Sequence, residues 1–213
     1  MKKLISVLAI CVAGPSYAAV LNFDDQGLTG PSLFADATAE TINETFGSID
    51  VELTGGAILS NTSFLPGNTT SVYGTADVPG IVELDGATNP LVISFSESIT
   101  NFFLDVFNGL PTVVTYTVAD NNGNFATFDL ASNLNGGFET IGFAATGDEV
   151  TVTASSSAMF GTGYDFFVDN ITFNEDLPPD LDGGGPNVVP LPAGAPLILT
   201  GLGLMAFLRR RKS

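Results

Sequence analysis

The sequence PLVISFSESITNFFLDVFNG, residues 90–109, decides the fold class of this chain. Apolar side chains occupy every second position in its first part and again in its second part. Alternate residues of a β-strand point to the same face of a sheet, so this period of two predicts two strands that each bury one face. The alternating apolar positions are Leu91, Ile93 and Phe95, then Phe102, Leu104 and Val106.

The same alternation recurs through residues 19–175, a length of 157 residues that suits one domain with one core. Turn sequences rich in Gly, Asn and Asp separate the runs. Eight or nine short antiparallel strands predict an all-β fold, a single antiparallel β-sandwich of the jelly-roll kind. In the last run we expect Phe167, Ile171 and Phe173 to share a face. The expected strands are residues 20–23, 49–53, 81–84, 90–96, 101–108, 114–118, 128–130, 150–152 and 164–174.

Charge is distributed very unevenly along the chain. The sequence has 23 Asp and Glu, 6 Lys and Arg and no His, and all basic residues lie at positions 2–3 and 209–212. The stretch 4–208 therefore carries only negative charges. This excludes a Ser-His-Asp or Cys-His nucleophile, a Schiff-base lysine and a His/Cys zinc site in the body of the chain. It also excludes nucleic-acid binding, which needs Lys and Arg to neutralise phosphates.

Residues 1–18 have the parts of a secretory signal peptide, which we expect to form an N-terminal signal helix. Two lysines precede a nine-residue apolar run, and the small residues Ser16 and Ala18 predict cleavage after Ala18. The alternative is an uncleaved anchor, but the apolar run is short against the roughly 20 residues of a membrane span. The single cysteine, Cys11, leaves with this peptide, so the mature protein must be stable outside the cytoplasm without disulfides.

The C-terminal part divides into a linker at 176–187, rich in Pro, Gly and acid, and a segment at 188–213. The apolar stretch 193–208 has 16 residues. As a helix it would be about 24 Å long against a hydrocarbon core of about 30 Å, so it spans a membrane only marginally as a short transmembrane helix. The basic residues after it would stay cytoplasmic and leave the acidic body outside. An ordinary tail anchor is one interpretation of this segment.

The segment 188–213 also resembles the PEP-CTERM class of bacterial sorting signals, in its VPLPA variant. The resemblance covers 26 of 213 residues and rests on a box, an apolar helix and a terminal basic cluster. It implies recognition by an exosortase-type membrane protease, a transient stay in the inner membrane, and export to the cell surface or beyond, commonly in connection with exopolysaccharide or biofilm. The matching residues are Val189, Pro190, Leu191, Pro192 and Ala193 in the box, and Arg209, Arg210 and Arg211 in the cluster.

Any binding chemistry in the body must use oxygen atoms, which are the ligands of a hard cation such as calcium. Asp24 and Asp25 follow the first strand, and Asp165 and Asp169 lie in the last. The first and last strands of a jelly roll are commonly close, so these four acids could share a structural calcium site. The alternative is that they cap turns or face solvent. The DNNGN sequence at 120–124 does not fit a calcium loop, because its glycine is misplaced, and we expect a hairpin turn there.

The body weakly resembles secreted jelly-roll domains of the carbohydrate-binding type, on the residues VDNITF at 168–173. That resemblance implies a structural calcium near the chain ends and possible affinity for polysaccharide. Glycoside hydrolysis is the one hydrolytic mechanism that two carboxylates can run unaided, but no spacing singles out a pair. The sequence therefore predicts an exported, non-catalytic surface or matrix protein. A lectin-like carbohydrate-binding module with structural calcium is the alternative, and a carboxylate-only glycoside hydrolase is a further one.

Overall fold

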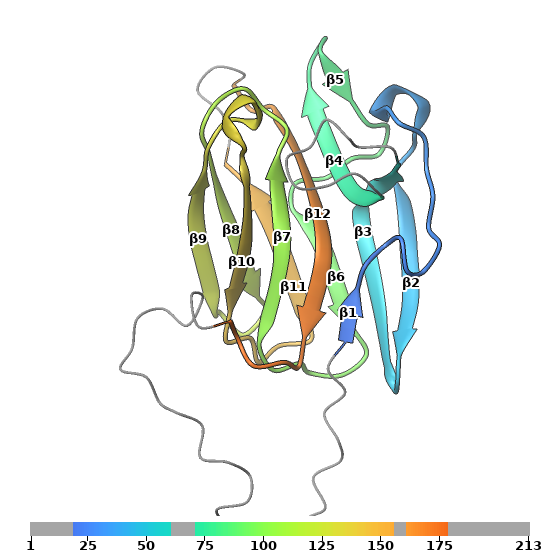
Figure 1. Cartoon of the computed structure of the whole chain (residues 1–213), viewed down its shortest axis with the longest axis vertical. Coiled ribbons are helices and arrows are strands. Elements are labelled where there is room, and N and C mark those ends of the chain that lie inside the picture. The colour runs from blue at the N-terminus through green and yellow to red at the C-terminus, as the bar shows by residue number, and fades with distance from the viewer. Residues whose placement is uncertain (1–18, 61–70, 156–160, 179–213) are drawn as a thin grey trace, which may run out of the picture. The chain divides into compact units, whose positions relative to one another are not determined.

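The computed structural model describes residues 19–60, 71–155 and 161–178. These residues form twelve β-strands and two short 3-10 helices, η1 and η2, so the fold is all-β as predicted (Figure 1). The expected number of eight or nine strands is wrong, because the alternation pattern predicts no strand at β2, β4 or β10. The elements are β1 Ala19–Leu21, η1 Phe34–Asp36, β2 Glu40–Phe46, β3 Ile49–Leu59, β4 Val72–Val78, β5 Val82–Glu83, β6 Leu91–Phe95, β7 Phe102–Asn108, β8 Val114–Asp120, β9 Phe125–Leu130, η2 Asn133–Asn135, β10 Phe138–Phe143, β11 Glu149–Ala154 and β12 Tyr164–Phe173.

The named strands pair antiparallel in one nearly closed sheet. Their order is β10-β7-β12-β4-β3-β6-β11-β8-β9, with β1 added to β12, β2 to β3 and β5 to β4. The two end strands, β9 and β10, contact each other, so little sheet edge is left open there. Figure 1 shows β10, β7 and β12 in one layer and β8, β11 and β6 behind them. This two-layer arrangement suits the expected sandwich, and its assignment as a jelly roll stays a prediction.

Strand β3 joins the two layers by bending in its middle. Its first half pairs with β2 and β6, and its second half, Ala57–Leu59, pairs with β4. The bend falls at Gly55, whose φ of 96° favours glycine, and at Gly56, where an added Cβ would lie 2.5 Å from the Gly74 carbonyl oxygen. Only glycine fits both positions without a shift of the backbone, so these two residues allow one strand to serve both layers.

The interior between the layers is apolar and rich in aromatic side chains. Phe95 packs edge-on against Phe173 at a centroid distance of 5.0 Å, and Tyr116 against Phe166 at 5.5 Å. Edge-to-face pairs of this kind are favoured by the ring quadrupole. A smaller apolar cluster lies on the other side of β4 and β12, where Phe34 of η1 stacks on Phe167 at 5.3 Å. The sandwich thus has one main core and a second, small one outside it.

A bulge in β12 changes which of its side chains face each of these two cores. The register against β7 shifts between Asp169 and Thr172, and Asn170 adopts a left-handed φ of 49°. Before the bulge, Phe167 faces the small outer cluster, whereas after it Ile171 and Phe173 face the main core. The expectation that these three residues share a face is therefore wrong. The extra residue in the bulge moves the following side chains to the opposite face, and a strict period of two does not predict this change.

Strand β1 pairs with the end of β12, with Ala19 opposite Phe173. The first and last strands are therefore adjacent, as expected, and both chain ends of the domain lie at the same end of the sandwich. Residues 1–18 and 179–213, which hold the predicted signal peptide, the sorting signal and both predicted helices, lie outside the described residues. Within the described ranges, no helix has the length and apolar character needed to cross a membrane.

Candidate functional site

The aspartates proposed to share a calcium site lie in different surroundings. At the β1 end, the side chains that meet across the two terminal strands are amides, with Asn22 Nδ2 donating to Asn170 Oδ1 over 2.9 Å. Asp24 is turned toward Ser71, whose backbone N–H donates to its Oδ1 over 3.0 Å. Asp25 is exposed in the turn that follows β1, where its backbone N–H bonds to Asn22 Oδ1 over 3.4 Å.

Asp169 lies directly opposite Asp105 of β7 and is almost fully buried. Asp105 accepts hydrogen bonds from Thr140 over 2.6 Å and from Asn170 over 2.8 Å, and Asp169 Oδ1 accepts one from the backbone of Asn170. Together with Asn22, these residues form a hydrogen-bonded network across β1, β12, β7 and β10. The network satisfies oxygen atoms that a cation would otherwise have to neutralise.

Asp165 lies near the beginning of β12, toward the opposite end of the strand from Asn170. Within the described ranges, no group of three or more His, Cys, Asp and Glu side chains is arranged to hold a metal ion. The structure brings Asn170 to the first strand but does not gather the four acids in one place. Calcium binding stays a prediction.

The DNNGN sequence forms the turn between β8 and β9, with Asp120 at its base. The Asp120 carboxylate accepts bonds from the backbone N–H groups of Asn122, Asn124, Thr146 and Gly147, and from the Asn124 amide. Burial alone would raise the pKa of Asp120, but these hydrogen bonds outweigh it and lower the pKa. The expected hairpin turn is confirmed. The Asp120 carboxylate also links this turn to the loop before β11.

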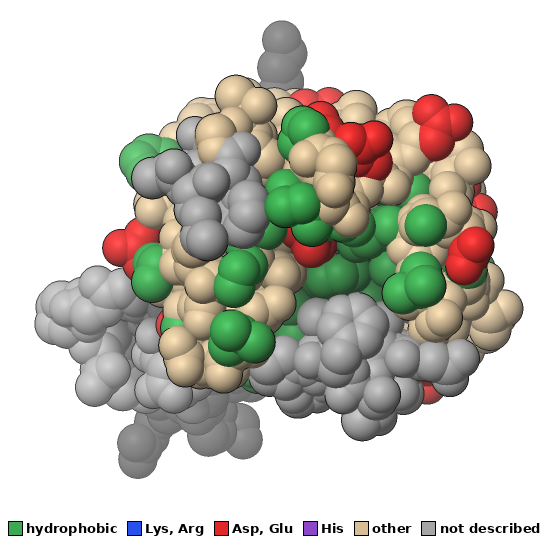
Figure 2. All heavy atoms as spheres, turned by 90° about the horizontal axis from the view of Figure 1, so that it is seen from above, with side chains coloured by type: hydrophobic (Ala, Val, Ile, Leu, Met, Phe, Trp, Pro, Cys, Tyr) green, Lys and Arg blue, Asp and Glu red, His purple; other side chains and the backbone are tan. Residues whose placement is uncertain are grey.

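An apolar groove lies at the Asp165 end of the sandwich, over the small outer cluster. It has a volume of about 380 Å³ and lies among η1, the end of β3, β5 and β12. Figure 2 looks onto this end and shows hydrophobic side chains around a hollow, with acidic side chains near its edge. The described residues that line the groove are Ser32, Leu33, Phe34, Ala35, Leu59, Ile81, Val82, Glu83, Asp165 and Phe167.

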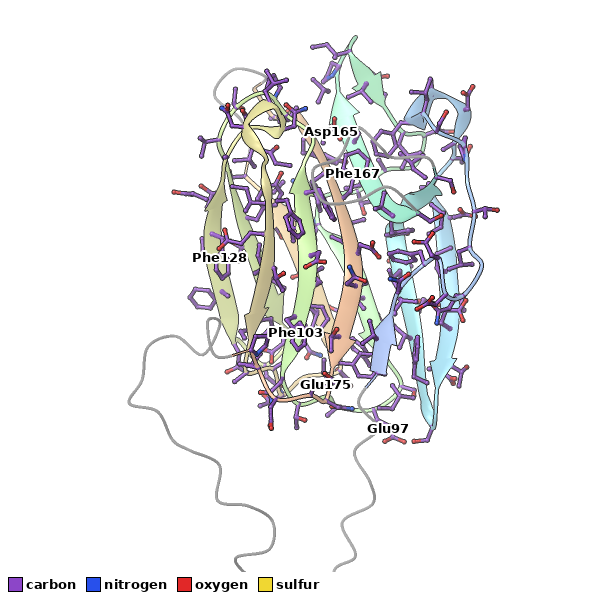
Figure 3. The ribbon with its side chains drawn as sticks, in the orientation of Figure 1. Glu97, Phe103, Phe128, Asp165, Phe167 and Glu175 are labelled. Atoms are coloured by element: carbon purple, nitrogen blue, oxygen red, sulfur yellow. The ribbon has the colours of Figure 1, made fainter. Side chains whose placement is uncertain are left out.

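Asp165 is the unusual member of this lining. Figure 3 shows Asp165 and Phe167 close together on β12, and the two residues lie on the same face of the strand. Part of the Asp165 side chain remains accessible, while its Oδ1 is enclosed and has no hydrogen-bond partner in the structure. A Cβ on Gly109 would lie 2.3 Å from this carboxyl group, so the glycine leaves the space that Asp165 occupies. Burial raises the pKa of Asp165 to about 7.

Tyr116, beneath the groove in the main core, is influenced by the same carboxyl group. Burial is the main cause that raises the pKa of Tyr116, and the negative charge of Asp165 adds to it. The Tyr116 hydroxyl donates to Asn108 Oδ1 over 3.2 Å, so it does not bond to Asp165. The carboxylate therefore has neither a cation nor a hydroxyl to offset its burial.

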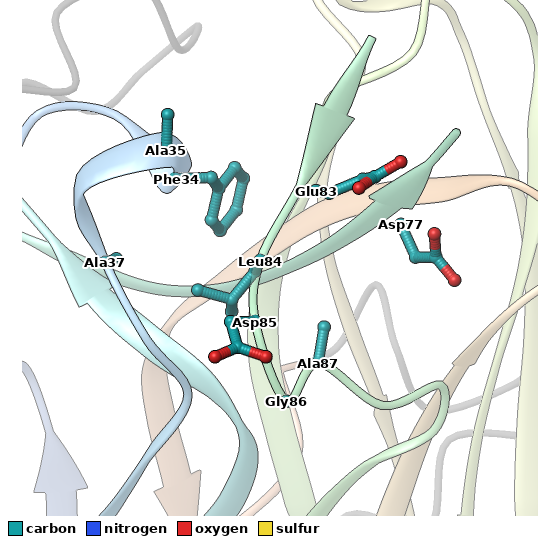
Figure 4. Close-up of a pocket in the computed structure, with 9 residues that line it drawn as sticks. All are labelled: Phe34, Ala35, Ala37, Asp77, Glu83, Leu84, Asp85, Gly86 and Ala87. Carbon is teal, nitrogen blue, oxygen red and sulfur yellow. The ribbon is translucent and has the colours of Figure 1, made fainter. Parts of the chain in front are cut away.

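A second, acid-lined depression of about 480 Å³ adjoins the groove and shares Phe34, Ala35 and Glu83 with it (Figure 4). Asp77 and Glu83 are directly opposite in the β4–β5 pair, and Asp85 also lines the depression. Like charges opposite each other in a strand pair are destabilising. The backbone N–H of Gly80 donates to Glu83 over 3.0 Å and offsets part of this repulsion.

Sequence reasoning missed the groove almost entirely. Of its lining, it singled out Asp165 for calcium, and it placed Ile81, Val82 and Glu83 in an expected strand. The available signal was a pair of large apolar residues in loops: Leu33 is 60% exposed and Ile81 is 70% exposed. Leu33 lies outside every expected strand and Ile81 begins a different one, so nothing in the pattern connected them.

The fold and the groove define an acidic, all-β domain with an apolar hollow at one end. No family model matches the chain, and no curated protein matches it. Among solved structures, the chain is similar to TmCBM61, solved in complex with β-1,4-galactotriose. The identity is 10%, the match covers 73% of this chain and 94% of that one, and the TM-score is 0.33. A similarity of this size carries no argument about the ligand of this domain.

Proposed function

We propose that this chain is an exported, non-catalytic protein of the cell surface or extracellular matrix, delivered by its C-terminal sorting signal. The observation that carries the proposal is the position of the charges. An acid-only body, residues 19–187, lies between two apolar segments with basic ends, at 1–18 and 188–213. That order fits a chain whose body is exported while its basic residues stay at the cytoplasmic face.

The arrangement of the chain ends supports the proposal. Ala19 pairs with Phe173, so the domain would be held through one end of the sandwich. The groove lies toward the other end of β12, and ten extended residues cover roughly 30 Å. Both chain ends therefore leave the domain at the end of β12 that lies away from the groove.

The non-catalytic part of the proposal rests on the chemistry of the body. None of residues 19–178 is Lys, Arg, His or Cys, so neither a histidine-activated nucleophile nor a Schiff-base lysine can be built there. The carboxylates of Asp120 and Asp105 serve as hydrogen-bond acceptors within the fold. Polysaccharide as a ligand and calcium as a structural ion remain predictions of the resemblance.

The proposal is tested by mass spectrometry of the full chain expressed in a Gram-negative host that carries an exosortase-type protease. We expect an exported protein that begins at Ala19 and has lost residues 209–213. A double variant of the box, Pro190→Ala with Pro192→Ala, should keep the tail, while the matched linker variant, Pro178→Ala with Pro179→Ala, should be processed normally. Exported wild-type protein that retains Arg209 to Ser213 would show that the segment is not a processed sorting signal.

A further inference from the structure

The inference concerns the unpartnered oxygen of Asp165. Its Oδ1 is enclosed beside the groove and receives no hydrogen bond, although the side chain lines the cavity. Buried polar groups in native proteins are nearly always paired, so such an atom calls for a donor that completes the site. Burial has already made the charged form of this carboxyl group unfavourable, and the donor that would stabilise it best is a cation.

The chain itself cannot supply that cation from its body. No Lys, Arg or His occurs between positions 4 and 208. The other ionisable residue of the groove lining, Glu83, is also negative, and Tyr116 beneath the groove is engaged with Asn108. The groups that face Asp165 therefore leave the groove with a negative field and no internal counter-charge.

Apart from Ser32, Glu83 and Asp165, the lining is apolar. Leu33 and Ile81 are largely exposed, and Phe34, Leu59 and Phe167 form the buried part of the cavity. A volume of about 380 Å³ lies within the range of small-molecule sites, which typically have apolar walls and a few polar groups that fix orientation. The groove thus combines an apolar surface, which suits the hydrophobic part of a ligand, with the carboxyl group of Asp165, which has no counter-charge.

We propose that the groove binds a small hydrophobic primary amine, with the ammonium group paired to the Asp165 carboxylate and the apolar body against Leu33, Ile81 and Phe34. An ammonium supplies the positive charge that the body of the chain lacks, beside a carboxyl group that lines the groove. An anionic ligand of the same size would be repelled by Asp165 and Glu83. The proposal is independent of the export route, because it depends only on the folded domain.

The test uses 2-phenylethylammonium and its neutral counterpart of equal size, 2-phenylethanol, titrated into the full-length protein by calorimetry at pH 8. A charge-assisted hydrogen bond distinguishes the two probes, so we expect the amine to bind roughly tenfold or more tightly than the alcohol. Asp165→Asn removes the charge while keeping the shape, and it should reduce the affinity for the amine to that for the alcohol. Circular dichroism would confirm that the variant keeps its β structure.

The matched control is Asp129→Asn. Asp129 is exposed on β9, bonds to Thr115 and is not part of the groove lining. This variant loses the same single negative charge and should bind the amine as the wild type does. Equal affinities of the wild type for the two probes, an amine affinity unchanged in Asp165→Asn, or an equal loss in both variants would each overturn the proposal. The last outcome would mean that the acidic surface attracts cations without a site.

Discussion

Replacing Asp165 by Asn should make the folded protein more stable at pH 8. The carboxyl group lies beside an apolar groove, its Oδ1 has no partner, and no basic residue lies between positions 4 and 208. Above pH 7 the folded domain must therefore hold a poorly solvated negative charge. Asn has nearly the same shape and carries no charge, so it removes this unfavourable term.

The magnitude follows from the shift of the Asp165 pKa, which burial raises from 3.8 to about 7. A shift of about 3 units corresponds to about 4 kcal/mol between the two protonation states, which is the upper limit of the effect. The direction is fixed by linkage. Between about pH 4 and pH 7 the unfolded chain loses its proton while the folded chain keeps it, so the free energy of unfolding falls as the pH rises.

The assay is urea unfolding of the full-length protein, followed by circular dichroism, at pH 4 and at pH 8. Urea is preferred to guanidinium because it does not screen charges. We expect Asp165→Asn to exceed the wild type by about 2–4 kcal/mol at pH 8. Nearly all of this difference in the free energy of unfolding should be present at pH 8 and absent at pH 4. Asp129→Asn reports the effect of losing one exposed negative charge and should follow the pH dependence of the wild type.

Two results would refute the reasoning. The first is a stability difference between Asp165→Asn and the wild type that does not change with pH, because a titrating buried acid must produce such a change. The second is a lower stability of the variant at pH 8. That would mean that the carboxylate is stabilised in the folded state by a donor, contrary to its unpartnered Oδ1.

Three further predictions concern stability. Asp120→Ala should lower the free energy of unfolding by at least about 2 kcal/mol at pH 7, because charge-assisted hydrogen bonds are lost. The pKa of Asp120 is lowered in the folded state, so this loss of stability should shrink as the pH falls below about 4. A loss that urea unfolding shows to be independent of pH would contradict this prediction. Gly56→Ala should lower the melting temperature more than Gly80→Ala, because a Cβ would lie 2.5 Å from the Gly74 carbonyl oxygen at the first position, whereas at the second only the left-handed φ of 72° opposes it. Equal losses in a thermal scan would count against the packing argument. If the predicted calcium site exists, chelator lowers the melting temperature and Asp24→Asn removes that response; identical melts with and without chelator would end that hypothesis.

The sequence alone was sufficient for the fold class, because alternation is a local property. Leu91, Ile93 and Phe95 are buried on one face, as their spacing predicts. The strands that the pattern missed have a different composition. β2, with the sequence ETINETF, buries only Ile42, and β4 contains a glycine and an aspartate, so neither shows a clear apolar alternation.

The acidic turn shows how far local chemistry extends into the structure. A hairpin between two strands was predictable from DNNGN, because Asn, Asp and Gly favour tight turns. That the Asp120 carboxylate also binds the backbone of Thr146 and Gly147 was not predictable, since those residues are more than 20 positions away. The sequence therefore predicts the turn, whereas the contact of the turn with the neighbouring loop depends on the folded sheet.

Composition determined which chemistry the body can perform, and tertiary structure determined where that chemistry lies. The absence of positive charge between positions 4 and 208 is fixed by the sequence in any fold. The separation of Asp165 from the first strand, and the pairing of Asn22 with Asn170 across 148 positions, depend on the register of β12 and on its bulge. The groove is assembled from η1, β3, β5 and β12, which are far apart in the sequence, so only the folded sheet could place Asp165 beside it.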